Sequence, residues 1–445
     1  MSRTDIRITS ARTIDLRFPT SRESIGSDAV NKDPDYSAAY CILETNSDLQ
    51  GHGLTFTLGR GTELCVLAMD YLSRFVIGKS LEEITANFAA FSRTLTEDSQ
   101  FRWLGPEKGV IHMAAGGLIN ALWDLYAKVE RKPLWLLLAE LEPEQIISAI
   151  DFRYIDDVLR PAETLELLRS RKNERQQRIA NLRQNGYLAY TTSVGWFGFD
   201  DEKIVRLSRQ AIAEGWTHFK LKVGGDPKDD LRRGRLVRQE IGWENRLMLD
   251  ANQKWGVEEA IQRTQGLAEL EPWWMEEPTN PDDILGHARI RREVHPIRIA
   301  TGEHCHSKVM FKQLLQAEAI DVCQVDSCRV AGVNENLAIV LMAQKFGVPV
   351  CPHAGGVGLC EQVQHLSAFD YISVSATMQD RVIEFVEHLH EHFVTPVSVR
   401  NGHYYLPEVP GYSIEIKPES LATYAFPDGD YWRANSEPHP AASVR

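Results

Sequence analysis

Long apolar runs are missing from this sequence. No segment of its 445 residues approaches the roughly 18 consecutive apolar residues that a membrane-spanning helix requires. The opening stretch, MSRTDIRITS, also lacks the apolar centre of a secretory signal. We therefore expect a protein that neither crosses a membrane nor is secreted.

Paired cysteines are missing too. The seven cysteines are odd in number and form no Cys-x-x-Cys motif, which disfavours a disulfide framework. Unpaired thiols are typical of proteins in a reducing compartment, so we expect a cytoplasmic location. The cysteines are Cys41, Cys65, Cys305, Cys323, Cys328, Cys351 and Cys360.

An excess of positive charge is also absent. The chain carries 62 acidic and 49 basic side chains, which gives a formal net charge of −13. Such a charge repels the phosphates of nucleic acids and of anionic membranes, so neither is an expected partner. An anionic small molecule would have to be attracted by charges placed locally around its site.

The order of apolar segments predicts two domains and a returning tail. Residues 1–140 mix strand-like alternation (DIRITSARTIDLRF, AAYCILETN) with helical spacing (GVIHMAAGGLINALWDLYAKVE), which indicates an α+β domain. Residues 141–395 are expected to form a separate α/β domain. Residues 396–445 are punctuated by Pro and Gly, and we expect them to return to the first domain and to end in disordered residues.

The middle region repeats a short apolar strand followed by a helical pattern. The later strand ends are 23 to 28 residues apart, which is the length of one βα unit. An open doubly wound sheet would also fit, but eight evenly spaced strands favour a closed (β/α)8-type barrel, a TIM barrel. The expected strand ends lie near Thr192, Lys222, Asp250, Glu276, Glu303, Asp326, His353 and Ala376.

Acidic residues end three successive strands of this predicted barrel. Asp250, Glu276 and Glu303 would meet at its carboxyl end, because neighbouring strands are only about 4.8 Å apart. Unpaired carboxylates at such spacing repel one another. A hard divalent cation such as Mg²⁺ would resolve this repulsion, and so would pairing with Lys or Arg.

The segment GEHCH at 302–306 also offers His304, Cys305 and His306, which are soft ligands suited to zinc. Strand alternation disfavours that alternative. If Glu303 faces the barrel interior, the two histidines face the other way unless the strand has already turned.

Two lysines share one face of the second predicted strand, in the segment THFKLKVGGD. Lys220 and Lys222 are two residues apart, so both are expected to point into the barrel mouth. A second ammonium and a divalent cation nearby would lower the pKa of Lys222 enough for it to act as a base. The alternative is a pair of solvated lysines.

An acid and a histidine end the next two strands. Asp326 on the sixth strand can hold one imidazole nitrogen of His353 on the seventh, which fixes its tautomer. The site would then offer one proton carrier on each side of a substrate.

This set of residues resembles the enolase superfamily and, within it, the mandelate racemase subgroup. Longer blocks, including GPEKGV, EEPTNPDDILGHA and CPHAGGVGLCE, are similar to the members of the superfamily that dehydrate L-fuconate. The resemblance covers nearly the whole chain, with the α+β domain acting as a cap over the barrel. It implies a (β/α)8-type barrel enzyme that binds Mg²⁺ and dehydrates an acid sugar, L-fuconate, to its 2-keto-3-deoxy product.

The resemblance also implies a role for each residue. Mg²⁺ would be held by the three carboxylates, and Lys220 would bind the substrate carboxylate. Lys222 would be the base and His353, oriented by Asp326, the acid. Glu384 would stay protonated and donate to the substrate carboxylate. The capping residues expected to close over the polyol end are Gly26, Ser27, Asp28 and Tyr36.

Other functions remain open at this stage. The same residues would serve another acid-sugar dehydratase or a 2-hydroxy-acid racemase, since a fold does not settle a function. A binding module that has lost catalysis is a further alternative, but every proton-transfer residue is present. The resemblance also implies assembly into a homo-oligomer.

Overall fold

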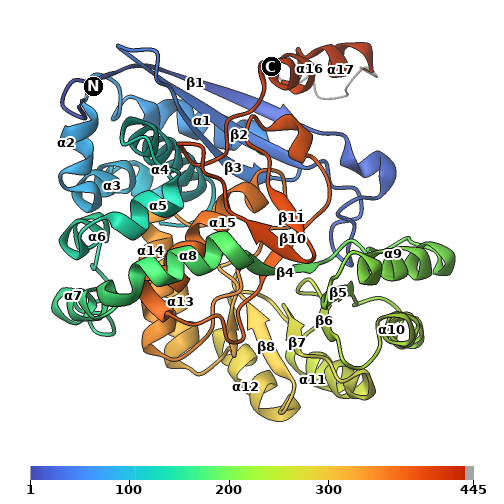
Figure 1. The fold of residues 1–445 in the computed structure, drawn as a ribbon. Helices are drawn as coiled ribbons and strands as arrows, with labels where there is room; N and C mark the ends of the chain where they lie inside the picture. Colours follow the sequence, from blue (N-terminus) through green and yellow to red (C-terminus); the bar gives the residue numbers. More distant parts are fainter. Residues whose placement is uncertain (1, 106, 436–445) are drawn as a thin grey trace.

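The computed structural model describes residues 2–105 and 107–435, arranged as a small sheet packed beside a larger barrel (Figure 1). Of the residues expected to be disordered, 434–445, those from 436 onward fall outside this range, whereas Ala434 is the last residue of a helix and Asn435 follows it. The small sheet is antiparallel, in the order β1 (Ile8–Arg17), β2 (Ser37–Thr45) and β3 (Gly51–Thr57). The first two strands agree with the sequence prediction, whereas β3 was not predicted.

Two helices cover this sheet, α1 (Thr62–Ser73) and α4 (Gly109–Val129). The long helix α4 approaches β3 so closely that a Cβ on Gly53 would lie 2.6 Å from the backbone nitrogen of Ala121. Glycine is therefore required at position 53 for the sheet and helix to touch. The small helices beside them are α2 (Leu81–Thr85), α3 (Phe88–Thr96), α5 (Leu134–Glu140) and α6 (Pro143–Ala149).

The barrel has the predicted (β/α)8-type architecture. Its strands run parallel in chain order, and the last strand pairs with the first to close the ring. The strands are β4 (Tyr187–Thr191), β5 (His218–Lys222), β6 (Arg246–Asp250), β7 (Trp274–Glu276), β8 (Arg298–Thr301), β9 (Val322–Cys323) and β10 (Ile383–Phe385). The seventh position is held by single bridges, Cys323 to Val350 and Asp326 to His353.

Helices surround the barrel and alternate with its strands. They are α7 (Pro161–Ser170), α8 (Arg175–Asn185), α9 (Asp201–Ala213), α10 (Pro227–Ile241), α11 (Val257–Gly266), α12 (Ile284–Val294), α13 (Lys308–Gln316), α14 (Gly332–Lys345) and α15 (Leu359–Phe369). Inside the ring, one layer of side chains from successive strands forms a packed core. That layer contains Tyr190, Met248, Trp274, Ala300, Val322, Cys351 and Val382.

The prediction of a strand ending near Ala376 is wrong. Residues Asp370–Ser375 continue α15 as a π-helical turn, and the eighth strand is β10. Arg178 Nε of α8 donates to the carbonyl of Ile372, and Nε of Arg171, which caps α7, donates to that of Val374, so these carbonyls are not free for strand pairing. A short apolar run such as this one cannot be assigned to strand or helix by periodicity alone.

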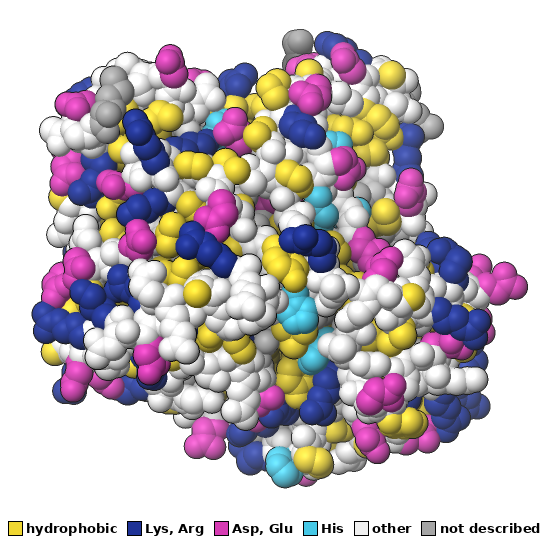
Figure 2. All heavy atoms as spheres, viewed as in Figure 1, with side chains coloured by type: hydrophobic (Ala, Val, Ile, Leu, Met, Phe, Trp, Pro, Cys, Tyr) yellow, Lys and Arg dark blue, Asp and Glu magenta, His cyan; other side chains and the backbone are white. Residues whose placement is uncertain are grey.

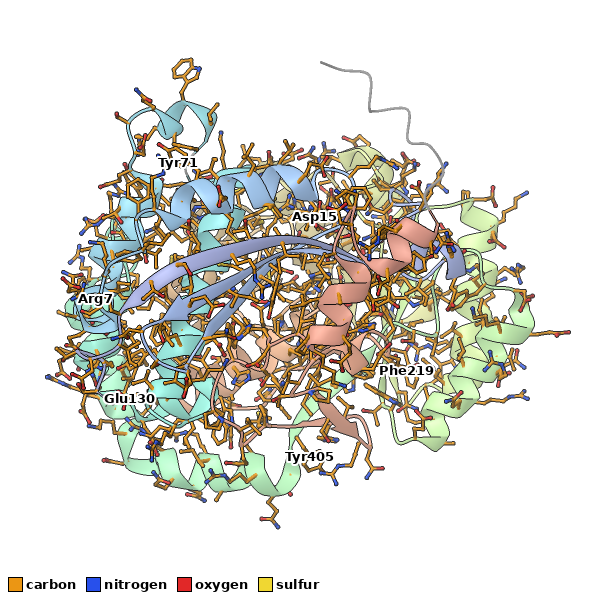
Figure 3. The ribbon with its side chains drawn as sticks, turned by 90° about the horizontal axis from the view of Figure 1, so that it is seen from above. Arg7, Asp15, Tyr71, Glu130, Phe219 and Tyr405 are labelled. Atoms are coloured by element: carbon orange, nitrogen blue, oxygen red, sulfur yellow. The ribbon has the colours of Figure 1, made fainter. Side chains whose placement is uncertain are left out.

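The C-terminal segment returns to both parts of the molecule. The hairpin of β11 (Ser398–Arg400) and β12 (His403–Tyr405) pairs with β4. Farther on, Ala425 bridges to Leu16 of β1, so the strand carrying Asp15 runs alongside the C-terminal helices when the molecule is seen from above (Figure 3). These helices are α16 (Pro418–Tyr424) and α17 (Asp430–Ala434).

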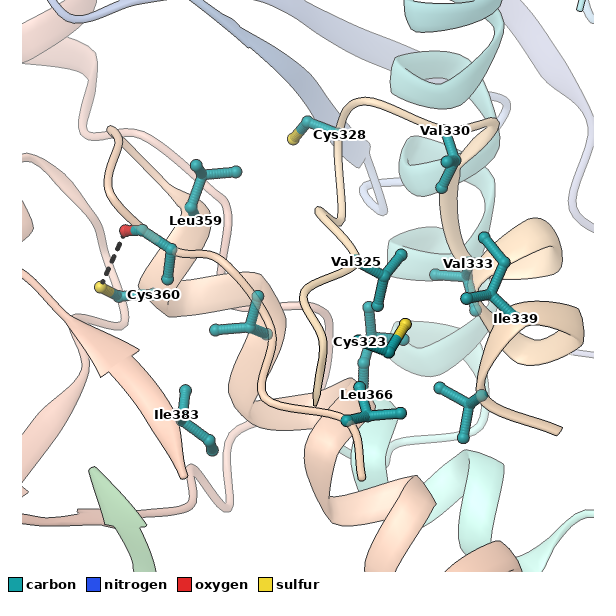
Figure 4. Packing of buried hydrophobic residues seen from close by; sticks show 14 of the residues in the cluster. Cys323, Val325, Cys328, Val330, Val333, Ile339, Leu359, Cys360, Leu366 and Ile383 are labelled. Atoms are coloured by element: carbon teal, nitrogen blue, oxygen red, sulfur yellow. Dashed lines mark hydrogen bonds between the residues drawn. The ribbon is translucent and has the colours of Figure 1, made fainter. Parts of the chain in front are cut away.

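The cysteines and the surface agree with the composition. All seven cysteines are free and buried, and Cys323, Cys328 and Cys360 lie in the hydrophobic packing, with Cys360 on α15 itself (Figure 4). Acidic and basic side chains are interspersed over the face seen in Figure 2. Among the described residues, no helix combines the length and the apolar character needed to cross a membrane.

Candidate active site

Three carboxylates converge at the carboxyl end of the barrel, as predicted. Asp250 and Glu276 end β6 and β7, where they are direct neighbours in register. Glu303 lies two residues beyond β8, on the loop that follows it. One oxygen from each of the three lies within 4.8 Å of the others. Oxygen donors at this spacing suit a hard cation such as Mg²⁺.

The cluster is buried, and this changes its protonation. Burial raises the pKa of Glu276 to about 8, and the charges of Asp250 and Glu384 add to that rise. Burial would also raise the pKa values of the other two, but Lys222 lowers that of Asp250 and His353 lowers that of Glu303. A cation bound among them would compensate the repulsion that Glu276 experiences.

His304 departs from its predicted orientation. Because β8 ends at Thr301, Glu303 and His304 lie on a loop, and strand alternation no longer separates them. His304 Nε2 lies 3.5 Å from Glu303 Oε1, so a second group of possible ligands consists of Glu277, Glu303 and His304. The predicted zinc alternative is not assembled, because Cys305 is fully buried in the core and His306 Nδ1 accepts from the backbone of Gly109.

Lys220 and Lys222 both enter the carboxylate cluster. Lys222 Nζ lies 2.6 Å from Asp250 Oδ2. Lys220 Nζ contacts Glu276 and lies 2.8 Å from Glu384 Oε1. The alternative of two solvated lysines is therefore wrong, since Lys220 is 1 % exposed and Lys222 is 7 % exposed.

The predicted fall in the pKa of Lys222 does not occur in this arrangement. Burial and the neighbouring ammonium of Lys220 both act to lower that pKa, but Asp250 outweighs them and the net shift is upward. Lys222 therefore carries a proton whenever Asp250 is left to pair with it alone. A cation must bind Asp250 before the pKa of Lys222 can fall enough for this lysine to act as a base.

His353 lies on the other side of the cluster. Its Nδ1 is 2.7 Å from Asp326 Oδ2, as predicted. Its Nε2 lies 3.2 Å from the backbone nitrogen of Gly355 and 3.7 Å from Glu303 Oε2. Burial alone would lower the pKa of His353, but Glu303, Glu384 and Asp326 raise it to about 10.

Glu384 lines the pocket, on the eighth barrel strand and not beyond it, and its neighbours lower its pKa. It lies on β10, where its Oε2 accepts from the backbone of Ala354 at 2.7 Å. Burial would raise its pKa, but Lys220 and His353 together lower it below the ordinary value. Glu384 is thus a carboxylate that holds Lys220, and the expected role as a donor does not fit this arrangement.

Three of the four predicted capping residues line the pocket, and Ser27 does not. Gly26, Asp28 and Tyr36 line the pocket above the cluster, a cavity of about 310 Å³. Both Asp28 oxygens accept from the loop itself, Oδ1 from Val30 and Asn31 and Oδ2 from the Asn31 side chain. Asp28 is therefore occupied in shaping its loop, whereas no described residue hydrogen-bonds with the Tyr36 hydroxyl.

Ser27 acts as a link between the domains. Its Oγ donates to the carbonyl of Phe197 at 2.9 Å, and the Phe197 backbone donates in return to the Ser27 carbonyl at 3.3 Å. Phe197 belongs to the loop after β4, so the cap loop is fastened to the barrel beside the pocket. Ser27 thus fastens the cap loop to the barrel and does not line the cavity.

Sequence reasoning missed several lining residues, among them Trp196, Asn252 and Arg329. Trp196 packs beside Lys222, whose Nζ is 5.5 Å from the ring centroid. Asn252 Oδ1 is buried without a hydrogen-bond partner among the described residues. All three follow the carboxyl end of a strand, which is the signal that could have found them.

Comparison with known proteins places this geometry in a family. Residues 34–139 match the mandelate racemase / muconate lactonizing enzyme N-terminal domain, and residues 203–420 match the enolase C-terminal domain-like family. The crystal structure of human mitochondrial enolase superfamily member 1 is 51 % identical, covers 97 % of this chain and 99 % of its own, and superposes with a TM-score of 0.96. The chain belongs to the enolase superfamily.

Two further similar proteins have a named activity or a bound ligand. An L-galactonate dehydratase from Hypocrea jecorina is 49 % identical over 443 residues, which is 98 % of each chain. A racemase from Streptomyces coelicolor, crystallised with bound magnesium, shares the fold at 24 % identity, with a TM-score of 0.74 and coverage of 94 % of this chain and 99 % of its own. The predicted superfamily is confirmed, while the narrower resemblance to L-fuconate enzymes stays a prediction.

Proposed function

We propose that this protein is a Mg²⁺-dependent dehydratase of acid sugars. The observation that carries the proposal is the placement of two proton carriers on opposite sides of the carboxylate cluster. Lys222 Nζ contacts Asp250 at 2.6 Å on one side, and His353 Nε2 lies 3.7 Å from Glu303 on the other. A substrate carbon held above the cluster would be accessible to one group on each face.

The residues present fit a magnesium site. Asp250, Glu276 and Glu303 supply only oxygen ligands, and burial raises the pKa of Glu276 in a way that a cation would reverse. Bound Mg²⁺ would supply positive charge that stabilises the developing enediolate and lowers the pKa of the nearby ammonium of Lys222. The magnesium named in the racemase structure supports the same choice of metal.

The proposed reaction removes water across C2 and C3 of the acid sugar. Lys220 binds the substrate carboxylate, and Glu384 orients Lys220 through their 2.8 Å contact. Lys222 takes the proton from C2, which leaves an enediolate. His353 then donates a proton to the C3 hydroxyl, the C3–O bond breaks, and water leaves. The resulting enol gains a proton at C3 and becomes the 2-keto-3-deoxy acid.

The proposed substrate has the configuration of L-galactonate from C2 to C5. L-Fuconate, the substrate expected from the sequence, is the 6-deoxy form of L-galactonate, so the two differ only at C6. The L-galactonate dehydratase that is similar along 98 % of this chain supports that configuration. The 310 Å³ pocket beneath the cap supports a small open-chain substrate.

A panel of acid sugars incubated with protein and Mg²⁺ tests the proposal. Formation of a 2-keto-3-deoxy acid from L-fuconate or L-galactonate is the expected result. Interconversion of C2 epimers without loss of water would instead indicate a racemase, since that reaction uses the same pair of proton carriers. The expected homo-oligomer and the cytoplasmic location also remain proposals, and sedimentation measurements test the first.

A further inference from the structure

Arg329 is an unusual residue of the pocket wall. It lies on the loop between β9 and α14, and it lines the cavity. Its backbone N–H donates to Asp326 Oδ1 at 2.9 Å, so the carboxylate that orients His353 also fixes the turn carrying Arg329. The position of this side chain is therefore tied to the catalytic pair.

The guanidinium of Arg329 has no charged partner among the described residues. Its Nε is buried without a hydrogen bond, and its Nη1 reaches only the sulfur of Met113, at 3.9 Å. By contrast, the half-buried Arg153 lies 2.9 Å from Glu107 Oε1 and also contacts Glu97. Burying a guanidinium nitrogen without an acceptor is costly, so the unpaired Nε of Arg329 points to a ligand that supplies the missing acceptor.

The other polar groups on the cap side of the pocket are largely occupied. Asp28 accepts from its own loop, and the Thr57 hydroxyl is 2.7 Å from that of Thr62. The deep end already supplies Lys220 and the carboxylate cluster for the substrate carboxylate. The groups left to meet the rest of an acid sugar include the Tyr36 hydroxyl, the unpaired Asn252 Oδ1 and Arg329, and of these Arg329 offers the most donors.

We propose that Arg329 determines specificity by binding the hydroxyl oxygens beyond C4 of a six-carbon acid sugar. This inference rests on the proposed dehydratase function and adds to it the residue that selects for chain length. Its guanidinium donates to the distal hydroxyls, while the carboxylate of the substrate lies at the opposite, deep end of the cavity. Arg329 thus makes long acid sugars better substrates than short ones of the same configuration.

The test compares two monoanions that are identical at C2 and C3. L-Galactonate has distal hydroxyls at C5 and C6, whereas D-threonate ends at C4 and has none. Arg329→Met should lower kcat/KM for L-galactonate by about ten- to a hundredfold, mainly through KM, and leave D-threonate within about twofold, because only the longer acid loses hydrogen bonds to a charged donor. Arg329→Lys, which keeps the charge, should recover part of the loss.

A matched control comes from Arg60, which lines the same pocket but has a side chain 83 % exposed and 3.8 Å from Asp33. Arg60→Met should change kcat/KM only slightly, and by the same factor for both acids. Equal losses for both acids in Arg329→Met would show that Arg329 only attracts anions, and would overturn the inference. No loss for either acid would overturn it as well.

Binding measurements separate this inference from the proposed function. Calorimetry with Mg²⁺ would compare the two acids in Lys222→Ala and in Lys222→Ala/Arg329→Met, neither of which should consume its ligand. Selective loss of L-galactonate affinity, with no turnover by the native protein, would sustain the inference and reject the dehydratase. Turnover by the native protein without selective loss of L-galactonate affinity would support the dehydratase and reject the role of Arg329. Absence of L-galactonate binding to Lys222→Ala would reject both proposals.

Discussion

Asp326 Oδ2 lies 2.7 Å from His353 Nδ1, while Asp326 Oδ1 accepts the backbone N–H groups of Cys328 and Arg329. One oxygen is thus fixed by the main chain and the other fixes the imidazole. Because the carboxylate can only accept, Nδ1 carries a proton and Nε2 is the nitrogen that faces the cluster. This arrangement points Nε2 of His353, the proposed proton donor, toward the carboxylate cluster.

Asp326→Asn should therefore impair catalysis much more than folding. The amide can still accept from the two backbone groups, but its NH₂ group favours the wrong imidazole tautomer. We expect kcat to fall by about 10³- to 10⁴-fold, as for other oriented histidines, with a thermal midpoint close to that of the native protein. Steady-state kinetics and calorimetry check both values, and near-native kcat would show that the pair is not needed.

Gly26→Ala should open the cap side of the pocket. Gly26 has φ of 78°, and an added Cβ would lie 2.6 Å from the Tyr36 hydroxyl, so the ring must move. We expect kcat/KM for acid sugars to fall at least about tenfold, because a buried contact with Tyr36 is lost.

Gly198→Ala is the matched control for that variant. Gly198 has a similar φ of 83°, but an added Cβ would meet nothing within 4 Å. Both substitutions should cost about 1 kcal/mol of stability through the left-handed backbone, and only Gly26→Ala should change kcat/KM. Equal effects on kcat/KM in the two variants would show that the position of Tyr36 in the pocket wall does not affect activity.

Removal of the metal should stop the reaction and also weaken the fold locally. Chelation by EDTA should abolish turnover and lower the thermal midpoint, since three carboxylates are left close together. Added Mg²⁺ should restore both. Full turnover in the chelated protein would reject the metal assignment.

Two neighbouring glutamates allow the ligand set to be tested. Glu276→Gln should weaken Mg²⁺ binding at least about tenfold in calorimetry, because it removes a charged ligand. Glu277→Gln should leave binding nearly unchanged, since both Glu277 oxygens accept from Gln253 Nε2 at 2.9 and 3.0 Å. The opposite ranking would assign the metal to the second group, which contains Glu277, Glu303 and His304.

The contact between α4 and α14 should make the stability of the folded protein depend on pH in the acidic range. Glu335 Oε2 lies 2.6 Å from His112 Nε2, and its Oε1 accepts from the backbone of Lys308. Burial would raise the pKa of Glu335, but His112 and Lys308 lower it to about 2. A lowered pKa stabilises the folded state above the ordinary value near 4.5, and that stabilisation is lost as the pH falls toward 2.

Glu335→Gln should consequently reduce the free energy of unfolding at pH 7 by about 3 kcal/mol. The difference from the native protein should shrink progressively below about pH 4.5. Thermal midpoints measured by calorimetry between neutral and acidic pH check this trend. A difference that is independent of pH would mean that the pair contributes nothing as a charge.

The sequence predicted the cluster of charged side chains at the carboxyl end of the barrel well, for a physical reason. Lys220, Lys222, Asp250 and Glu276 lie on strands whose alternation fixes which side chains face inward. Convergence of those side chains then follows from the closed parallel topology. Even where the seventh strand is reduced to bridges, Asp326 and His353 pair directly.

Loops were predicted less well, because their hydrogen bonds are not periodic. Nothing in the sequence indicates that Asp28 is occupied by Val30 and Asn31, or that Ser27 is fastened to Phe197. Protonation states were also beyond sequence reasoning. The pKa of Glu384 depends on Lys220, His353 and the Ala354 N–H meeting around it, which only the assembled barrel determines.

The division of labour between Lys222 and His353 is the central claim, and solvent exchange at C2 tests it most directly. L-Galactonate would be incubated in D₂O with Mg²⁺ and with the native protein, His353→Asn or Lys222→Ala, and followed by proton NMR. We predict a 2-keto-3-deoxy product only with the native protein, exchange of the C2 proton without product in His353→Asn, and neither event in Lys222→Ala. Exchange that persists in Lys222→Ala but disappears in His353→Asn would contradict the account and reverse the two roles.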